Sequence, residues 1–132
     1  MLRFYTYRRV SLEEQANTGH SLDAQLERLG AWCKAMGHKF VGDYCDAGVS
    51  GSIAPEERPA FAAMLAALAK GEADGMLAIA LDRFSRKTAD VLALVDLAER
   101  EEWKIVSLRE SLDTSSATGR FVVTLLAAVA QL

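Results

Sequence analysis

Arginine recurs beside hydroxyl and carboxylate side chains at three separate places in the sequence. The residues concerned are Arg9 with Ser11, Asp46 with Ser50 and Arg58, and Asp82 with Arg83 and Arg86. Guanidinium groups bind phosphate oxygens through paired hydrogen bonds and stabilise the extra negative charge of a phosphodiester under attack. A hydroxyl among them could be the attacking group once it is activated. These residue types therefore indicate a site that handles phosphate.

Other phosphate chemistries fit the sequence less well. No histidine lies close to Ser11 in the sequence, which argues against a Ser-His-Asp hydrolase. The sequence also has no GxxxxGK[ST] motif and no dense group of carboxylates or histidines for two metal ions. Metal-free transesterification, with arginine as the electrophilic partner, remains. Taken singly, each residue also has an ordinary interpretation as a surface ion-pair arginine, a turn aspartate or a capping serine.

These residues can meet only if strands and helices alternate along the chain. Aromatic and β-branched residues predict a strand over residues 2–10, and further strands over 39–44, 75–81 and 103–108. Helical spacing of apolar residues predicts helices after Ser21, from Pro59, near Thr88 and from Thr118. This order predicts an α/β domain with a mostly parallel sheet of four to five strands and helices on both faces. The three arginine segments then share the edge where such sheets bind ligands.

The composition is that of one folded domain with a local basic region. The 132 residues are 51% hydrophobic and 25% charged, with a net charge of −3, which excludes disorder and a globally basic nucleic-acid binder. The longest uncharged run is about a dozen residues, whereas a membrane span needs roughly 20. Cys33 and Cys45 are predicted to be free thiols in a reducing cytosol. We expect a cytoplasmic protein without a metal, a cofactor or a membrane partner.

Six blocks of the sequence resemble, in order, the motifs of serine site-specific recombinases of the resolvase/invertase family. The blocks are Tyr7-Arg8-Arg9-Val10-Ser11-x-x-x-Gln15, Gly19-x-Ser21-Leu22-x-x-Gln25, Asp46-x-x-x-Ser50-Gly51, Arg58-Pro59-x-Phe61, Leu81-Asp82-Arg83-x-x-Arg86 and Asp113-Thr114-x-x-x-x-Gly119-Arg120. Each block alone is weak, but together they span nearly the whole chain. The second and last blocks look more like large serine recombinases (integrases) or transposon resolvases than like small invertases.

The resemblance implies a catalytic domain, of bacterial, phage or mobile-element origin, that cuts and rejoins double-stranded DNA at specific sites. Ser11 would be the nucleophile and form a 5′-phosphoseryl intermediate. Arg9, Arg83 and Arg86 would bind the phosphate, and Asp82 would transfer a proton or orient the arginines. Supporting positions would be Tyr7, Gln15, Gln25, Asp46, Ser50 and Arg58. No metal or cofactor is implied, because the phosphoseryl bond conserves the energy needed for rejoining.

The sequence ends in an uncharged, apolar segment from Phe121 to Leu132 that is predicted to be helical. A helix without a polar face is buried in a core or paired with another chain. The resemblance favours pairing, since the family's interface helix begins near Gly119 and continues past this length. The predicted interface residues are Phe121, Val122, Leu125, Leu126 and Val129. We expect residues 1–132 to be a catalytic domain truncated in this helix, without the DNA-binding domain. The resemblance implies that the protein self-associates as a dimer, and as a tetramer when active.

Two other functions are compatible with an α/β domain of this size. A receiver-like binding module would need an acidic pair at the end of the first strand, where this chain has Tyr7-Arg8-Arg9. A catalytically inactive, resolvase-like regulatory or dimerisation domain would be expected to have lost site residues. Ser11 and the candidate arginines are all present, which favours the active enzyme.

Overall fold

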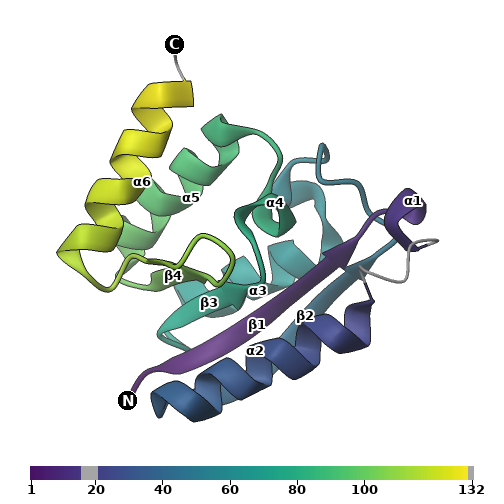
Figure 1. Ribbon diagram of the computed structural model, residues 1–132, viewed down its shortest axis with the longest axis horizontal. Helices are drawn as coiled ribbons and strands as arrows, with labels where there is room; N and C mark the ends of the chain where they lie inside the picture. Colours follow the sequence, from purple (N-terminus) through teal and green to yellow (C-terminus); the bar gives the residue numbers. More distant parts are fainter. Residues whose placement is uncertain (16–20, 131–132) are drawn as a thin grey trace.

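The computed structural model describes residues 1–15 and 21–130; Gly19 and His20, which begin the second motif, and the last two residues lie outside these ranges. A five-stranded sheet in the order β2-β1-β3-β4-β5 forms its centre (Figure 1). The first four strands are parallel, and the short fifth strand runs antiparallel to β4. The strands are β1 (Arg3–Val10), β2 (Lys39–Ala47), β3 (Gly75–Ala78), β4 (Lys104–Ser107) and β5 (Leu112–Asp113). The predicted α/β class with a mostly parallel sheet is confirmed.

Helices cover both faces of the sheet, as predicted. The long helices are α2 (Leu22–Met36), α3 (Pro59–Ala69), α5 (Thr88–Glu101) and α6 (Ala117–Ala130). Helix α2 lies along one face, α3 and α5 pack on the opposite face, and α6 lies beside α5 (Figure 1). The described residues also form the short helical turns α1 (Leu12–Gln15), η2 (Pro55–Glu57) and α4 (Leu81–Phe84). No helix within the described ranges combines the length and apolarity needed to cross a bilayer.

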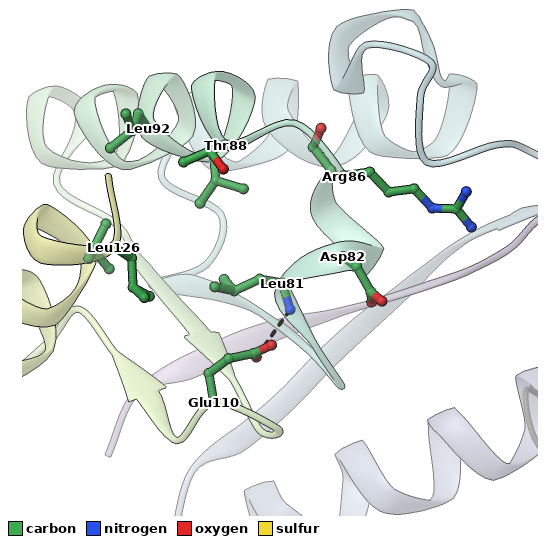
Figure 2. Close-up of a pocket in the computed structure, with 10 residues that line it drawn as sticks. Leu81, Asp82, Arg86, Thr88, Leu92, Glu110 and Leu126 are labelled. Atoms are coloured by element: carbon green, nitrogen blue, oxygen red, sulfur yellow. Dashed lines mark hydrogen bonds between the residues drawn. The ribbon is translucent and has the colours of Figure 1, made fainter. Parts of the chain in front are cut away.

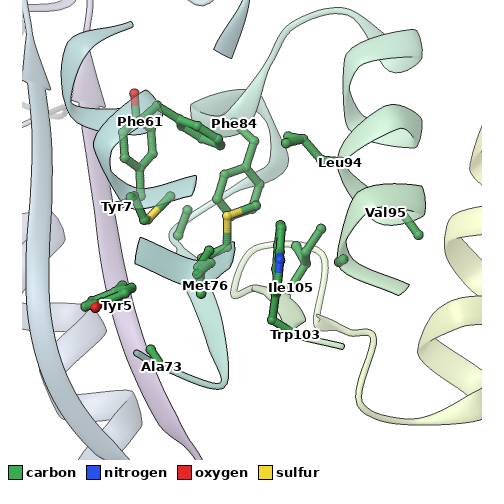
Figure 3. Packing of buried hydrophobic residues seen from close by; sticks show 14 of the residues in the cluster. Tyr5, Tyr7, Phe61, Ala73, Met76, Phe84, Leu94, Val95, Trp103 and Ile105 are labelled. Atoms are coloured by element: carbon green, nitrogen blue, oxygen red, sulfur yellow. The ribbon is translucent and has the colours of Figure 1, made fainter. Parts of the chain in front are cut away.

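Alternation along β1 divides the core into two clusters. Phe4 packs with Leu29 and Cys33 of α2, whereas Tyr5 and Tyr7 face the α3 and α5 side. The larger cluster, shown in Figure 3, includes Phe61, Met76, Phe84, Leu94, Trp103 and Ile105. Because side chains alternate, the next odd-numbered residue of β1, an arginine, must point toward the same side as the two tyrosines.

The local signals for helix ends operate as the sequence predicts. The Ser21 hydroxyl caps α2 by accepting a hydrogen bond from the N–H of Ala24 at 3.3 Å. Gly37, with φ of 71°, ends the helix in the left-handed region that glycine adopts without strain.

The strand predicted over residues 75–81 is shorter in the structure and ends at Ala78. The apolar run reflects burial rather than strand length, because the Ala80 carbonyl accepts from the N–H of Arg83 and closes a turn. This turn is α4. It brings a motif with two charged residues back toward β1 instead of extending the sheet.

Candidate active site

The carboxyl ends of β1 and β3 bring the predicted arginine segments to one edge of the sheet. Arg9 and Ser11 lie at the end of β1, with Arg9 directly opposite Asp46 of β2. Asp82 and Arg83 lie in α4, which follows β3 and contacts β1. Parallel sheets bind ligands at this edge. The three segments that could handle phosphate therefore meet where such a ligand would lie.

Arg9 is fully buried, and the backbone holds its guanidinium. The group donates from Nε to the carbonyl of Arg83 at 3.1 Å, from Nη1 to that of Val49 at 2.9 Å, and from Nη2 to that of Asp82 at 2.7 Å. Burial, with the neighbouring charges of Arg83 and Arg58, lowers the pKa of Arg9 to about 10. The side chain is still a cation at neutral pH, and its carbonyl partners fix it without neutralising it.

Arg58 is the second fully buried arginine, and its guanidinium holds backbone and side-chain groups around the site in place. Its Nη1 donates to the Arg83 carbonyl at 2.9 Å and to the Tyr7 hydroxyl at 3.3 Å. Its Nε donates to the carbonyl of Ile53 at 3.1 Å. Since Arg9 and Arg58 bind the same Arg83 carbonyl, they hold the backbone of α4 against β1.

Tyr7 and Asp46 connect this arrangement to α3. The buried Tyr7 hydroxyl donates to Oδ2 of Asp46 at 2.8 Å, and burial raises the pKa of this hydroxyl, which keeps it protonated. The Asp46 carboxylate also accepts from the N–H groups of Ala60 at 2.9 Å and Phe61 at 3.1 Å, in the first turn of α3. A carboxylate is favoured there because those N–H groups lack helical partners. Tyr7 and Asp46 therefore position three elements around the site.

Ser11 begins α1 through reciprocal hydrogen bonds with Glu14. The Glu14 N–H donates to Ser11 Oγ at 3.1 Å, and the Ser11 N–H donates to Glu14 Oε1 at 3.1 Å. This is the capping box of a Ser-x-x-Glu sequence. Sequence reasoning missed Glu14 as a site residue, although the spacing from Ser11 is a readable signal for it.

The Glu14 carboxylate also contacts three arginines. Its Oε2 accepts from Nη2 of Arg83 at 2.7 Å, and its Oε1 accepts from Nη1 of Arg83 at 3.2 Å. Nη1 of Arg9 lies 3.7 Å and Nη2 of Arg86 lies 3.8 Å from Oε1. Burial alone would raise the pKa of Glu14, but the hydrogen bonds from Arg83 and the Ser11 N–H outweigh it and lower the pKa to about 2. One ionised carboxylate therefore joins the Ser11 cap to the arginine cluster.

Asp82 lies on the more exposed side of the site. Its Oδ1 accepts from Nε of Arg83 at 3.0 Å, and its Oδ2 lies 3.5 Å from Nη1 of Arg109. Burial opposes ionisation, but Arg83 and Arg109 together lower the pKa of Asp82. Its carboxylate is therefore ionised at neutral pH and orients Arg83.

The Arg86 side chain is half-exposed and passes close to Gly51 in the loop after β2. A Cβ atom at Gly51 would lie 2.8 Å from Nη2 of Arg9 and 2.9 Å from Cγ of Arg86. A glycine is needed at this position because it leaves room for both arginines.

Comparison with known proteins identifies the family of this chain. Residues 4–132 match the family model described as the resolvase N-terminal domain. The chain belongs to the resolvase family. The fold agrees, because the N-terminal catalytic domain of TP901-1 integrase superposes with a TM-score of 0.89 at 38% identity, over 98% of this chain and 94% of that one. A resolvase-family recombinase from Streptococcus pneumoniae gives a TM-score of 0.80 at 28% identity, over 99% and 87% of the two chains.

Two curated relatives of this resolvase-family domain are longer than it is. It is 35% identical over 130 residues to the probable DNA-invertase y4cG of Sinorhizobium fredii, covering 98% of this chain and 37% of that protein. It is 29% identical over 128 residues to the Tn917 resolvase of Enterococcus faecalis, covering 97% of this chain and 61% of that protein. The chain thus spans between about a third and two thirds of the length of these two proteins.

The remaining predicted positions lie at different depths in the resolvase-family domain. Gln25 of α2 is buried and donates from Nε2 to the Arg9 carbonyl at 3.3 Å, the same oxygen that accepts from Arg83 at 2.8 Å. Ser50 is half-buried, and its hydroxyl bonds within its own loop to that of Ser52 at 2.8 Å. Gln15 is exposed on α1. Gln25 is thus part of the support for the arginines, whereas Ser50 and Gln15 lie at the margin of the site.

The five predicted interface residues of α6 share one property, their exposure. The exposed fractions run from 36% to 64% for Phe121, Val122, Leu125, Leu126 and Val129. Val123, on the inner side of the helix, is buried in the larger core cluster. Between α4, α5 and α6 lies a cavity of about 460 Å³, with Leu92 and Leu126 at one end and Asp82 and Arg86 at the other (Figure 2). The apolar surface of α6 thus continues to the edge of the arginine site.

Proposed function

We propose that this chain is the catalytic domain of a site-specific DNA recombinase that uses Ser11 as its nucleophile. One observation carries the proposal: the Glu14 carboxylate that accepts a hydrogen bond from the Ser11 N–H is also the carboxylate that Arg9, Arg83 and Arg86 contact. The residue that carries the candidate nucleophile and the three cations therefore contact a single anionic group. A scissile phosphate needs the same surroundings.

In the proposed reaction, Ser11 Oγ attacks the phosphorus of one DNA strand. The P–Oγ bond forms, the P–O3′ bond breaks, and the hydroxyl proton is transferred to the leaving 3′ oxygen. The product is a 5′-phosphoseryl linkage with a free 3′-hydroxyl, and attack by a 3′-hydroxyl on the same phosphorus reverses the step. No net energy source is needed, because one phosphoester replaces another.

The arginines stabilise the charge that develops on the phosphate oxygens. Four guanidinium groups, of Arg9, Arg58, Arg83 and Arg86, lie at the edge, and among the described residues the carboxylates that form ion pairs with Arg9, Arg83 and Arg86 are those of Glu14 and Asp82. This surplus of positive charge favours a transition state more anionic than the substrate. Asp82 orients Arg83 by accepting the hydrogen bond from Arg83 Nε at 3.0 Å.

The partners follow from the same surfaces. Double-stranded DNA at specific recombination sites is the proposed substrate, inside a bacterial cytoplasm. We propose that the exposed apolar side of α6 pairs with a second copy, giving a dimer and, in the active form, a tetramer. Exposed apolar patches of this kind mark contacts between proteins.

A covalent trapping experiment tests the proposed function. The full-length protein that contains this chain is incubated with DNA fragments that flank its own gene, labelled at the 3′ or the 5′ end of one strand. After denaturation, the 3′-labelled strand should migrate with the protein, and the 5′-labelled strand should be released with an extendable 3′-hydroxyl. Ser11→Ala should abolish the adduct, and Ser115→Ala, at an exposed serine, should retain it.

The results distinguish the enzyme from the inactive regulatory domain. An adduct that persists in Ser11→Ala would rule out Ser11 as the nucleophile. A folded wild-type protein that binds the fragments but forms no adduct would favour the regulatory role.

A further inference from the structure

Glu14 differs from the neighbouring acidic residue of α1 in its partners. Glu13 is exposed, whereas the Glu14 side chain is 13% exposed and forms ion pairs with Arg9, Arg83 and Arg86. The contact with Arg83 is bidentate, with separate hydrogen bonds of 2.7 and 3.2 Å to the two carboxylate oxygens. Arginine binds a phosphate through the same paired geometry. The arginine cluster is therefore already engaged by an anion that the chain itself supplies.

We propose that the Glu14 carboxylate occupies the position of the scissile phosphate among the three arginines, so that the DNA backbone must displace it before Ser11 can react. The inference rests on the proposed function, because it concerns the regulation of that same site. A phosphate and the carboxylate compete for the same guanidinium donors. Both cannot hold Arg83 through its two Nη groups at once.

Displacement of Glu14 also changes the surroundings of Ser11. The Ser11 N–H and hydroxyl are both engaged with Glu14 in the capping box. If the carboxylate leaves, the N–H loses its acceptor and the first turn of α1 loosens. Phosphate binding is thereby coupled to loosening of the backbone turn that carries Ser11, whose hydroxyl is held by the Glu14 N–H of the same turn.

Helix α1 packs loosely enough for Glu14 to be displaced. The helix has four residues, none of them buried, and Leu12 is 75% exposed. Hydrogen bonds and ion pairs at one edge therefore hold α1, rather than a hydrophobic contact with the core. An element held in this way can move without opening the core.

Glu14→Gln tests the inference, because the amide keeps an oxygen that can accept from the Ser11 N–H and loses the charge. Glu13→Gln is the matched control, with the same change in charge one residue away on the exposed side. The full-length protein carrying each change is assayed for the rate of adduct formation on the flanking DNA fragments. We expect Glu14→Gln to accelerate the adduct about tenfold, since charge-assisted hydrogen bonds are roughly twice as strong as neutral ones, and Glu13→Gln to match the wild type.

A second measurement does not depend on DNA cleavage. Thermal melting in inorganic phosphate, against chloride of equal ionic strength, reports binding of the phosphate anion alone. Phosphate should raise the Tm of Glu14→Gln more than that of the wild type or Glu13→Gln. If Glu14→Gln unfolds, Glu14→Asp replaces it, because the shorter side chain withdraws the charge from Arg83 by one methylene.

The outcomes separate this inference from the proposed function. A wild-type adduct with no acceleration in Glu14→Gln, and no gain in phosphate binding, would overturn the role of Glu14 alone. Slower adduct formation in a folded Glu14→Gln protein would do the same, because it would make Glu14 a positive contributor to the reaction. No adduct in any variant, with phosphate binding still enhanced by Glu14→Gln, would reject the recombinase function and keep the competing anion.

Discussion

The arginine edge, which is the sheet edge that carries Arg9, Arg58, Arg83 and Arg86, buries charged side chains that usually lie in solvent. Helix α6 does the opposite and exposes apolar side chains that are usually buried. At the edge, Arg9 and Arg58 are fully buried, whereas on α6 Phe121 and Val129 are 62% and 64% exposed. Buried charge is tolerated only where hydrogen bonds satisfy it, and exposed apolar surface is retained where a partner covers it. The edge satisfies its charges with carbonyl groups of this chain, but the described residues leave the outer side of α6 in solvent. The comparison separates a region whose charges are satisfied within one chain from a region for which we propose a second copy as the partner.

This difference determines what substitutions should do in each region. Changes to the buried arginines remove hydrogen bonds within the chain, so they should lower the free energy of unfolding. Changes to the outer side of α6 should leave that free energy nearly unchanged and weaken association instead.

The largest effect is expected from Arg58→Leu. The change leaves the carbonyl of Ile53 and the Tyr7 hydroxyl oxygen without the Arg58 donor, and the Arg83 carbonyl keeps only the hydrogen bond from Arg9 Nε. Loss of one member of a buried charged network costs about 3–5 kcal/mol, which urea denaturation would measure. Arg28→Leu, at an exposed arginine of α2, should change the free energy of unfolding by less than about 0.5 kcal/mol. Equal losses in the two variants would mean that the edge is no more than an ordinary surface.

Arg86→Met should affect chemistry rather than folding. The Arg86 side chain is half-exposed and forms a 3.8 Å ion pair with Glu14. Loss of this side chain should therefore barely change Tm. Loss of one group that stabilises a developing charge typically costs about 10²–10³-fold in rate, here in the rate of adduct formation. Lys87→Met removes the same charge at the next residue, which is exposed, and should retain the wild-type rate. A large drop in Tm for Arg86→Met would instead place Arg86 with the buried, structural arginines.

The contrast between these arginines could be predicted from the sequence only in part. Alternating strands and helices place Arg9 and Arg83 at one edge, because parallel strands end together. Their burial could not be predicted, since it depends on carbonyl groups of Val49 and Asp82 that reach Arg9 through loop and turn geometry. Hydrogen bonds to backbone groups leave no trace in residue type.

Two other features show the same limit. The capping box of Glu14 was readable as a spacing, but its ion pairs with arginines far along the chain were not. Strand β5 is two residues long and antiparallel, too short for any periodicity to reveal. Tertiary context, rather than local preference, forms both.

On α6, Leu125→Ser and Val123→Ser should have opposite consequences. Leu125 is 48% exposed, and burial of a leucine side chain contributes about 1.5–3 kcal/mol. About half of this is available on association, because Leu125 is already half-buried in the single chain, and in a two-fold interface the loss occurs twice. The dissociation constant of the dimer should therefore rise about 10- to 10²-fold in sedimentation experiments. Val123, 3% exposed, should cost stability and leave association of the folded protein intact. If Leu125→Ser lowers Tm as much as Val123→Ser and associates normally, the outer side of α6 is not the interface.

The smallest expected effect is a change in acid sensitivity that belongs to the arginine edge. The pKa of Glu14 is about 2 in the folded chain against its ordinary 4.5, so its ionised form stabilises the fold above pH 4.5 and the contribution is lost as pH falls toward 2. Glu14→Gln should therefore show a shallower fall in the free energy of unfolding between about pH 5 and pH 2 than Glu13→Gln, measured by urea denaturation at each pH. Residues 121–130 of α6 contain no ionisable side chain, and Leu125→Ser should accordingly follow the wild-type acid profile. Parallel profiles for the two glutamate variants would mean that the Glu14 ion pairs contribute nothing to folding, and that the edge is held by its backbone acceptors alone.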